Sequence, residues 1–426
     1  MLSHKKIINK FNQLEVKYYG DKNFEISKNQ LHLLIWNKKF IFPKFTFSGF
    51  IANLILLILS YVSIILCKIK KINIANYFIV HRGKNGQYDF RSDYILRNHN
   101  FKKSLNIIRC PSFIDSLKSY LLYPNVIFYL PIDYFNSSLF YKKSTLKNNY
   151  EILHEKEKKN YQHIKKIFIF LNIKKFLSID DQRVIQVFLK VCSDLKIKSF
   201  GYMHYKFSKY IVGIKYLCFD NFIVWSEYFK KKLIDVNNKY KSKKVFISGF
   251  LKKNYKTSNK KNTASILYII DLDLDFESTS NLLKKLNKEK KINLYVKLKP
   301  QKTETKWEKF CYKENIQYFK LENLDQVNQS VCIDYFVANV STAILESTLY
   351  GAMPLKIISK NDFADDLIQD KVVKKIRNLS DIVKITRNKP SSKQIDKIFN
   401  KVWGKIKYKP STIKNFFLNY IYDKNN

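Results

Sequence analysis

Short apolar segments alternate with amphipathic ones along most of this chain. Between two apolar segments, residues 181–195 place Val184, Ile185 and Phe188 on one side of a helix. Strands that alternate with helices are typical of α/β domains built around a parallel sheet. We therefore predict an α/β fold. The runs that read as buried strands are residues 74–80, 106–108, 126–130, 198–203, 222–225, 245–247, 266–270, 293–298 and 332–340, and residues 167–173 and 176–179 are apolar segments in a basic context.

The length of 426 residues exceeds what a single hydrophobic core usually holds. We expect two large domains, a basic segment and an apolar helix before them, and a helical tail after them. The clearest linker candidate is residues 252–263, which are rich in Lys, Asn, Ser and Thr. The expected parts are residues 1–44 (basic segment), 45–70 (apolar helix), 71–220 (first domain), 221–390 (second domain) and 391–426 (tail).

Residues 45–67 carry no charge and are long enough to cross a bilayer, which takes about 20 residues. Asn53, Ser60 and Ser63 weaken that interpretation, and lysines flank both ends, so the positive-inside rule assigns no orientation. Three interpretations stay open: a helix lying in the membrane interface, a true span, and a buried core helix. Each of them can keep the rest of the chain on the cytoplasmic side. The start of the chain lacks the apolar core of a signal peptide.

A strand, a pair of hydroxyl residues and a helix follow one another late in the chain. Residues 335–340 are typical of a buried strand, and Ser341 and Thr342 are residue types that cap helix N-termini. Residues 343–350 then read as a helix that a glycine and a proline end. Such a unit presents backbone N–H groups to an anion, and phosphate is its natural ligand. Glu346 lies one turn after Thr342 on the same face, where a carboxylate could accept hydrogen bonds from a ribose.

Four further polar residues follow predicted strands. Lys299 stands where open α/β sheets bind ligands and could meet a phosphate, or it is one more solvated lysine. Asp180 and Asp181 either lie at the functional edge of a sheet or cap the next helix. His204 is either a base or phosphate ligand, or a structural histidine.

The formal net charge is +43, from 78 Lys and Arg against 35 Asp and Glu. The basic residues are spread along the whole length beside abundant Asn, Ile, Phe and Tyr, the mixture that A/T-rich codons give. Without a recognition motif, this pattern favours attraction to anionic membranes and phosphorylated substrates over nucleic-acid binding. Six cysteines without C-x-x-C spacing indicate free thiols in a reducing compartment. Neither the cysteines nor the seven histidines have the spacing of a metal site.

Together these segments resemble the GT-B glycosyltransferases of bacterial surface-polysaccharide synthesis. Within that fold they look closest to capsular polysaccharide transferases and the related CDP-glycerol glycerophosphotransferases. The resemblance covers roughly residues 165–360. The segments that carry it are 199–208 (SFGYMHYKFS), 224–226 (VWS) with the helix that follows, 245–250 (VFISGF), 299–300 (KP) and 339–354.

The resemblance implies two Rossmann-like domains that face each other across a cleft. The N-terminal domain would hold the acceptor and the C-terminal domain the nucleotide donor. Ser341 and Thr342 would then bind the donor diphosphate, and Glu346 its ribose. Lys299 would meet a phosphate, while His204 would lie across the cleft near the reacting centre. Such enzymes usually stabilise the leaving diphosphate without a catalytic metal, so no metal and no cofactor are expected.

We therefore expect a membrane-associated glycosyltransferase that moves a sugar from a nucleotide-sugar donor to a lipid-linked or growing surface polysaccharide. His204, Asp180 or Asp181 would act as the base or orient the acceptor. The expected place is the cytoplasmic face of the bacterial inner membrane, with peripheral or single-helix attachment. The partners would be the donor, a glycan or lipid-linked acceptor and the anionic membrane surface, and no nucleic acid. Two alternatives are a polyol-phosphate transferase that uses a CDP-glycerol or CDP-ribitol donor, and a non-catalytic membrane-associated scaffold.

Overall fold

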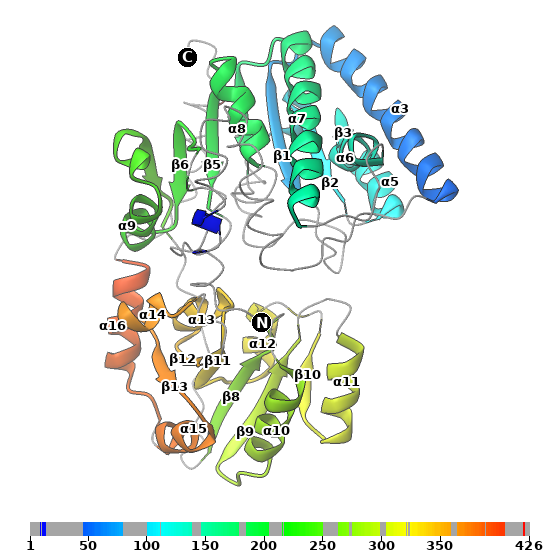
Figure 1. The fold of residues 1–426 in the computed structure, drawn as a ribbon. Coiled ribbons are helices and arrows are strands. Elements are labelled where there is room, and N and C mark those ends of the chain that lie inside the picture. The colour runs from blue at the N-terminus through cyan, green and yellow to red at the C-terminus, as the bar shows by residue number, and fades with distance from the viewer. Residues whose placement is uncertain are drawn as a thin grey trace. The chain divides into compact units, whose positions relative to one another are not determined.

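The structure is a computed structural model of the chain, and it divides into two compact units (Figure 1). One unit includes Lys6–Trp225 and Lys230–Ser248, and the other includes Ser226–Phe229 and Gly249–Tyr408. Within the residues that the structure describes, each unit contains one sheet. The residues that the structure describes are 9, 11–13, 46–79, 100–110, 112–138, 146–178, 185–203, 215, 217–249, 263–271, 275–298, 304–320, 322, 324–358, 364–387, 389–404 and 421.

The N-terminal unit is built on a seven-stranded sheet in which every recorded pairing is parallel. The first strand, β1, lies inside the sheet, with β2 on one side and β4 on the other. The strand order therefore reverses between β1 and β4. In sheet order the strands are β3 (Val126–Phe128), β2 (Leu105–Arg109), β1 (Ile74–Ile79), β4 (Lys175–Ser178), β5 (Lys198–Tyr202), β6 (Asn221–Val224) and β7 (Lys244–Ile247).

Aromatic side chains fill the core between this sheet and its helices. The ring of Phe188 stacks on Phe176, with centroids 5.1 Å apart, and on Tyr77, with centroids 4.9 Å apart. Such pairs add about 0.5–1.5 kcal/mol each beyond the area that they bury. The unit's helices are α3 (Phe47–Ile69), α5 (Phe113–Leu122), α6 (Tyr129–Ser138), α7 (Leu146–Leu171), α8 (Ile185–Asp194) and, from Lys230 on, α9 (Glu227–Val236), with short 3-10 turns η1 (Phe101–Lys103) and η2 (Asn238–Ser242).

Helix α3 is the apolar helix that the sequence predicts, and it packs beside β3 at the end of the sheet (Figure 1). The Ser60 hydroxyl accepts a hydrogen bond of 3.0 Å from the backbone N–H of Phe128 in β3. The same hydroxyl donates to the Leu56 carbonyl at 2.7 Å. Leu56, Ile64 and Cys67 are buried on this face of the helix. One side of α3 therefore belongs to the core of the N-terminal unit.

The C-terminal unit is built on a six-stranded sheet, again with parallel pairings throughout. Its central strands are continuous apolar runs, as expected for strands covered on both faces. In sheet order they are β10 (Gln317–Phe319), β9 (Ile292–Lys297), β8 (Ala264–Ile269), β11 (Tyr335–Ala338), β12 (Met353–Ile357) and β13 (Lys374–Ile376). The helical elements are α10 (Phe276–Asn287), α11 (Glu304–Lys313), α12 (Leu324–Ser330), α13 (Ala343–Glu346), η3 (Ser347–Tyr350), α14 (Asp366–Gln369), α15 (Leu379–Thr386) and α16 (Ser392–Val402).

Residues after α16 anchor the helical segment that follows β11. The buried Trp403 indole donates a hydrogen bond of 3.0 Å to the Thr348 hydroxyl in η3. Its ring also packs against Phe229, with centroids 5.6 Å apart. The Ser226 hydroxyl donates to the carbonyl of Val402. Trp403 therefore packs η3 against the start of α9.

The predicted α/β fold with two parallel sheets is confirmed. The predicted boundary between residues 220 and 221 falls inside the first sheet, because β6 and β7 continue that sheet beyond β5. The predicted strand 126–130 is shorter in the structure, since α6 begins at Tyr129. Strands β10, β12 and β13 are absent from the sequence prediction. The arrangement of the two domains about a cleft stays a prediction.

Candidate functional site

The candidate site lies where the strand order of the C-terminal sheet reverses. The sheet grows from β8 toward β9 and β10 on one side, and from β8 toward β11, β12 and β13 on the other. Open α/β sheets bind ligands outside the carboxyl ends of the strands at this reversal. The segment that follows β11 begins at Asn339 and contains the predicted residues Ser341 and Thr342. The hydroxyl pair therefore stands at the position in the sheet where a ligand is expected.

A buried carboxylate holds the first two residues of this segment. Asp271 follows β8 and is 3% exposed. Its Oδ2 atom accepts hydrogen bonds from the backbone N–H groups of Asn339 and Val340, both at 2.8 Å. Hydrogen bonds to a charged group contribute about 1.5–3 kcal/mol each. Asp271 therefore connects β8 and β11 beyond the last hydrogen bonds of their strand pairing. It fixes the position of the backbone at which the segment after β11 begins.

A buried lysine holds the same segment from the other side. Lys356 lies in β12, opposite Ala338 of β11, and its side chain is completely buried. Its Nζ atom donates to Oδ1 of Asn339 at 3.1 Å and lies 2.9 Å from Oδ1 of Asp365, a residue that is 37% exposed. A buried ammonium group is tolerated when it is paired in this way. Lys356 thus brings a positive charge to the carboxyl edge of the sheet.

Ser341 and Thr342 differ in what their hydroxyl groups do. The Ser341 hydroxyl accepts a hydrogen bond of 3.3 Å from the backbone N–H of Ala343 and so caps the first turn. Thr342 is 2% exposed, and its hydroxyl has no hydrogen-bond partner within the part of the chain that the structure describes. In that part, the backbone N–H groups of Ser341 and Thr342 likewise donate to no acceptor. Buried polar groups are nearly always hydrogen-bonded, so this cluster of donors is typical of a ligand contact.

The predicted helix 343–350 is present as α13 and η3, and it ends at Gly351 with a left-handed φ of 72°. Glu346 lies on its buried side and is 3% exposed. Burial raises the pKa of Tyr350 well above its usual value, and the negative charges of Glu346 and Asp325 raise it further. Tyr350 therefore stays protonated and donates to Oδ1 of Asp325 at 3.0 Å, which fastens the segment to α12.

The remaining predicted site residues lie outside the described residues. These are Lys299, Asp180, Asp181 and His204. The strands that precede them are confirmed, since β9 ends at Lys297, β4 at Ser178 and β5 at Tyr202. Their roles stay predictions. Of the predicted donor-binding residues, Ser341, Thr342 and Glu346 are brought together in one segment.

Three residues of the site are missing from the sequence prediction: Asp271, Asn339 and Lys356. An acidic residue directly after a buried strand was the available signal for Asp271, the same signal that marked Asp180. Lys356 gave no such signal, because the chain around it contains Pro354, and a proline argues against a central strand.

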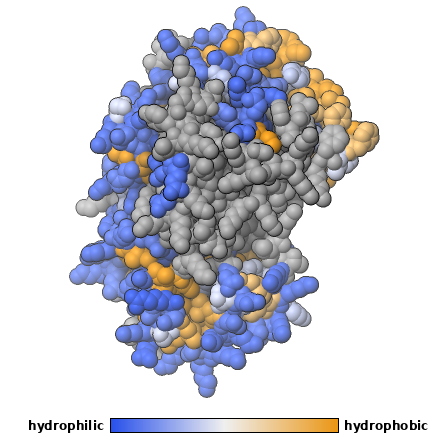
Figure 2. All heavy atoms as spheres, viewed as in Figure 1, coloured by the Kyte–Doolittle hydropathy of each residue, from blue (hydrophilic) through white to orange (hydrophobic). Residues whose placement is uncertain are grey.

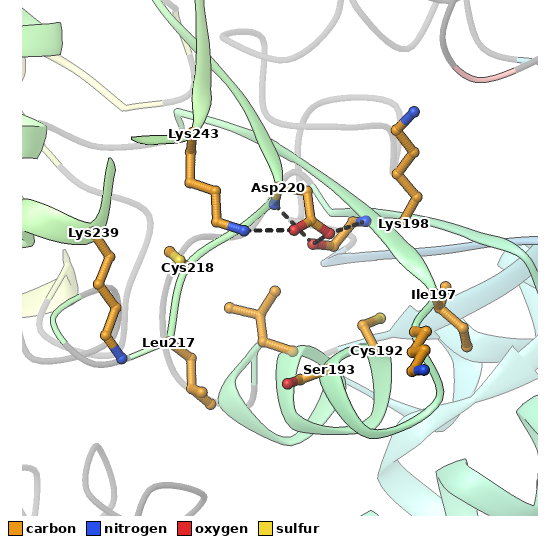
Figure 3. Close-up of a pocket in the computed structure, with 12 residues that line it drawn as sticks. Cys192, Ser193, Ile197, Lys198, Leu217, Cys218, Asp220, Lys239 and Lys243 are labelled. Carbon is orange, nitrogen blue, oxygen red and sulfur yellow. Dashed lines mark hydrogen bonds and ion pairs between the residues drawn. The ribbon is translucent and has the colours of Figure 1, made fainter. Parts of the chain in front are cut away.

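A pocket of about 520 Å³ lies in the N-terminal unit, at the amino ends of β5, β6 and β7 (Figure 3). Asp220 accepts there from the backbone N–H of Ser199 at 3.0 Å and from the Ser199 hydroxyl at 2.9 Å. It also pairs with Lys243 at 2.8 Å. These bonds join residues at the amino ends of three neighbouring strands, so we interpret this cluster as structural. Its position differs from the carboxyl edge, where the ligands of such sheets bind.

Within the described ranges, no group of three His, Cys, Asp or Glu side chains is arranged to hold a metal ion. The expectation that the reaction needs no metal stays a prediction. All six cysteines are free thiols, as the sequence predicts.

No protein-family model and no curated protein matches this chain. Several solved structures have a fold similar to that of this chain, at low sequence identity. HepE from Anabaena, in complex with UDP and glucose, is 10% identical with a TM-score of 0.46, over 82% of this chain and 99% of that one. MurG from Acinetobacter baumannii is 10% identical with a TM-score of 0.47, over 82% and 99%. MnaA from S. aureus, in complex with UDP, is 12% identical with a TM-score of 0.47, over 82% and 98%. The candidate site therefore rests on its own residues and contacts.

Proposed function

We propose that this chain is a metal-independent GT-B glycosyltransferase that moves a sugar from a nucleotide-sugar donor to a lipid-linked or growing surface polysaccharide. The sequence resemblance supplies the class of reaction. The observation that carries the proposal is the buried Thr342 hydroxyl, which has no partner among the described residues and lies where the strand order reverses. Leaving such a group unsatisfied costs about 1–3 kcal/mol, which a bound ligand would recover.

In this proposal the donor diphosphate accepts hydrogen bonds from the Thr342 hydroxyl and from the backbone N–H groups of Ser341 and Thr342. These donors would stabilise the negative charge that develops on the diphosphate as the bond to the sugar breaks. Lys299 would add a positive charge. The Glu346 carboxylate would accept hydrogen bonds from the ribose hydroxyls, and this contact would separate a nucleotide from a bare phosphate.

The acceptor side of the reaction rests on residues of the N-terminal unit. His204, Asp180 or Asp181 would take the proton from the acceptor hydroxyl as it attacks the sugar, or would orient that hydroxyl. The strands that precede these residues, β4 and β5, are neighbours in the sheet, so their carboxyl ends lie at one edge. Support for this half of the proposal comes from the sequence resemblance and from this strand order.

The proposal is tested by thermal unfolding of the full chain with UDP, GDP and CDP. A nucleotide at about 100 times its Kd adds about 2.7 kcal/mol to the free energy of unfolding, which raises Tm by about 5–10 °C. We expect Thr342→Val and Glu346→Ala to remove this shift. Thr386→Val in α15 and Glu314→Ala, directly after α11, are matched controls, and both should keep it.

The nucleotide that protects the wild-type chain separates the alternatives. Protection by UDP or GDP supports transfer of a sugar, whereas protection by CDP alone supports the polyol-phosphate transferase. If none of the three nucleotides raises Tm, the chain is not a nucleotide-dependent transferase, and the scaffold interpretation is favoured.

A further inference from the structure

The two sides of helix α3 have different environments. The inner side is fixed to the N-terminal unit through the bond between Ser60 and Phe128, and through the buried residues Leu56, Ile64 and Cys67. Near its end, Lys68 donates a hydrogen bond of 2.6 Å to the carbonyl of Phe170 in α7. The helix is therefore part of the folded unit along most of its length.

The outer side of α3 is apolar and exposed. Ile58 is 55% exposed, Ile65 57% and Ile69 70%. Figure 2 shows hydrophobic side chains gathered over this helix. A single exposed apolar residue is ordinary, but a continuous row of them marks an interaction surface. The other large apolar side chains that α3 exposes are Phe47, Ile51, Leu54, Ile55, Tyr61, Val62 and Leu66.

Two neighbouring helices extend this surface. Helices α5 and α7 both contact α3. In α5, Leu121 is 85% exposed and Ile114 64%, and in α7, Ile169 and Phe170 are exposed as well. We call the exposed apolar residues of α3, α5 and α7 the apolar face. It is formed by segments far apart in the sequence, so folding, and not one hydrophobic run, creates it.

Lysines accompany the apolar face on all three helices. Lys68 and Lys70 are exposed at the end of α3. Lys118 is exposed in α5, one turn from Ile114 and Leu121, and Lys166 is exposed in α7, one turn from Phe170. No acidic residue occurs between Lys44 and Tyr88. An apolar surface with basic residues around it matches an anionic lipid surface, where each nearby lysine contributes about 1 kcal/mol.

We propose that the apolar face is a membrane-docking surface, on which α3 lies in the plane of an anionic bilayer with its inner side still packed on the sheet. In this position the outer side chains enter the boundary between headgroups and acyl chains, roughly 5–10 Å deep. The lysines stay at the headgroup level, because their long side chains can reach the polar layer. The inference does not depend on the proposed transfer reaction.

This arrangement differs from a span. To cross the bilayer, α3 would have to leave β3, which would remove the acceptor of the Phe128 N–H and expose Leu56, Ile64 and Cys67. It also differs from a dimer contact. A second copy of this chain would bring its own lysines against Lys68, Lys118 and Lys166, and like charges repel.

The experiment measures binding of the full chain to vesicles by co-sedimentation. We compare vesicles of phosphatidylcholine alone with vesicles that also contain phosphatidylglycerol. We expect stronger binding to the anionic vesicles, weakened by salt. Replacing both Ile58 and Ile65 by Glu should lower the partition coefficient at least about tenfold, which equals about 1.4 kcal/mol. Tyr312→Glu, at an 86% exposed position of α11 in the other unit, is the matched control and should bind normally.

Three results would overturn the inference. Equal vesicle binding by the wild-type chain and the double variant would show that the apolar face does not contact the membrane. A dimer in sedimentation velocity without vesicles, converted to a monomer by the double variant, would show that a second copy covers the face. Loss of amide protection at residues 126–128 upon vesicle binding would show that α3 leaves β3 and inserts on its own. Nucleotide protection of Tm is a separate readout, so failure here leaves the proposed function untouched.

Discussion

Lys356 donates a hydrogen bond of 3.1 Å to the side-chain oxygen of Asn339, so a completely buried ammonium group fixes the first residue after β11. The two residues lie on neighbouring strands, and Asp271 holds the backbone of Asn339 from the strand on the other side. Three strands thus determine where the segment with Ser341 and Thr342 begins. A ligand site needs such support, because its contacts must be placed to within a fraction of an ångström.

Lys356→Met should destabilise the C-terminal unit. The substitution keeps an apolar chain of similar length but removes the hydrogen bond to the buried Asn339 oxygen and the ion pair with Asp365, at a cost of roughly 1–3 kcal/mol. Urea unfolding measures the loss. Lys375→Met, at the facing position of β13 where the side chain is exposed, is the control and should change the free energy of unfolding by less than about 0.5 kcal/mol. Equal effects of both substitutions would contradict the bracing role of Lys356.

Thr342→Val should raise the stability of the ligand-free protein. Valine has nearly the shape of threonine and removes a buried hydroxyl that has no partner among the described residues. The free energy of unfolding should increase by up to about 1–3 kcal/mol, while nucleotide protection is lost. Urea unfolding without ligand measures the first effect. A substitution that stabilises the fold and abolishes binding cannot act by unfolding the site. A loss of stability would instead show that the hydroxyl has a structural role.

Ser60→Ala should weaken the attachment of α3 to the sheet. The Phe128 N–H would lose its acceptor, and a buried unpaired donor costs about 1–3 kcal/mol. Hydrogen exchange at the Phe128 amide is the direct measurement, and it should become about 5- to 150-fold faster. Ser63→Ala removes a buried hydroxyl from the same face of the helix and should leave this amide protected. An unchanged exchange rate of the Phe128 amide in Ser60→Ala would mean that another group accepts the hydrogen bond from this N–H.

The pair Asp220–Lys243 should make the stability of the N-terminal unit depend on pH. Burial by itself raises the pKa of Asp220, but the bonds from Lys243 and Ser199 outweigh it, and the pKa lies below its usual value. The hydrogen bond to Asp220 in turn raises the pKa of Lys243. The lowered pKa means that the stability is present above the unfolded value, about 3.9, and is lost as pH falls through the folded value.

Lys243→Met should therefore destabilise the unit at neutral pH and have little effect in acid, once Asp220 is protonated in both proteins. Urea unfolding at neutral and acid pH measures the difference, with Lys241→Met, an exposed lysine of η2, as the control. If the loss of unfolding free energy in Lys243→Met is the same at both pH values, Lys243 stabilises the unit through packing of its methylene groups, and its charge contributes nothing.

The sequence predicted the strands that contain short, mostly apolar runs, because strands in a parallel sheet are largely covered on both faces. The sequence did not predict β12, because Pro354 lacks a backbone N–H donor and a proline normally argues against an interior strand. β10 and β13 each have three residues, and two residues of each are exposed, too few to give a pattern. The site residues likewise fall into those that a local sequence pattern reveals and those that it does not. Ser341, Thr342 and Glu346 were visible as a local motif, whereas Asp271, Asn339 and Lys356 matter through contacts between strands that only the folded sheet brings together.

The bond between Ser60 and Phe128 joins residues that are 68 positions apart in the chain. During synthesis α3 emerges first, and the strand that covers its inner side follows roughly 3–14 s later at about 5–20 residues per second. Throughout that interval both sides of a helix whose only charged residue is Lys68 are unprotected. If the apolar face docks on a membrane as proposed, a lipid surface close to the ribosome would shield the nascent helix from aggregation before the N-terminal unit has finished folding.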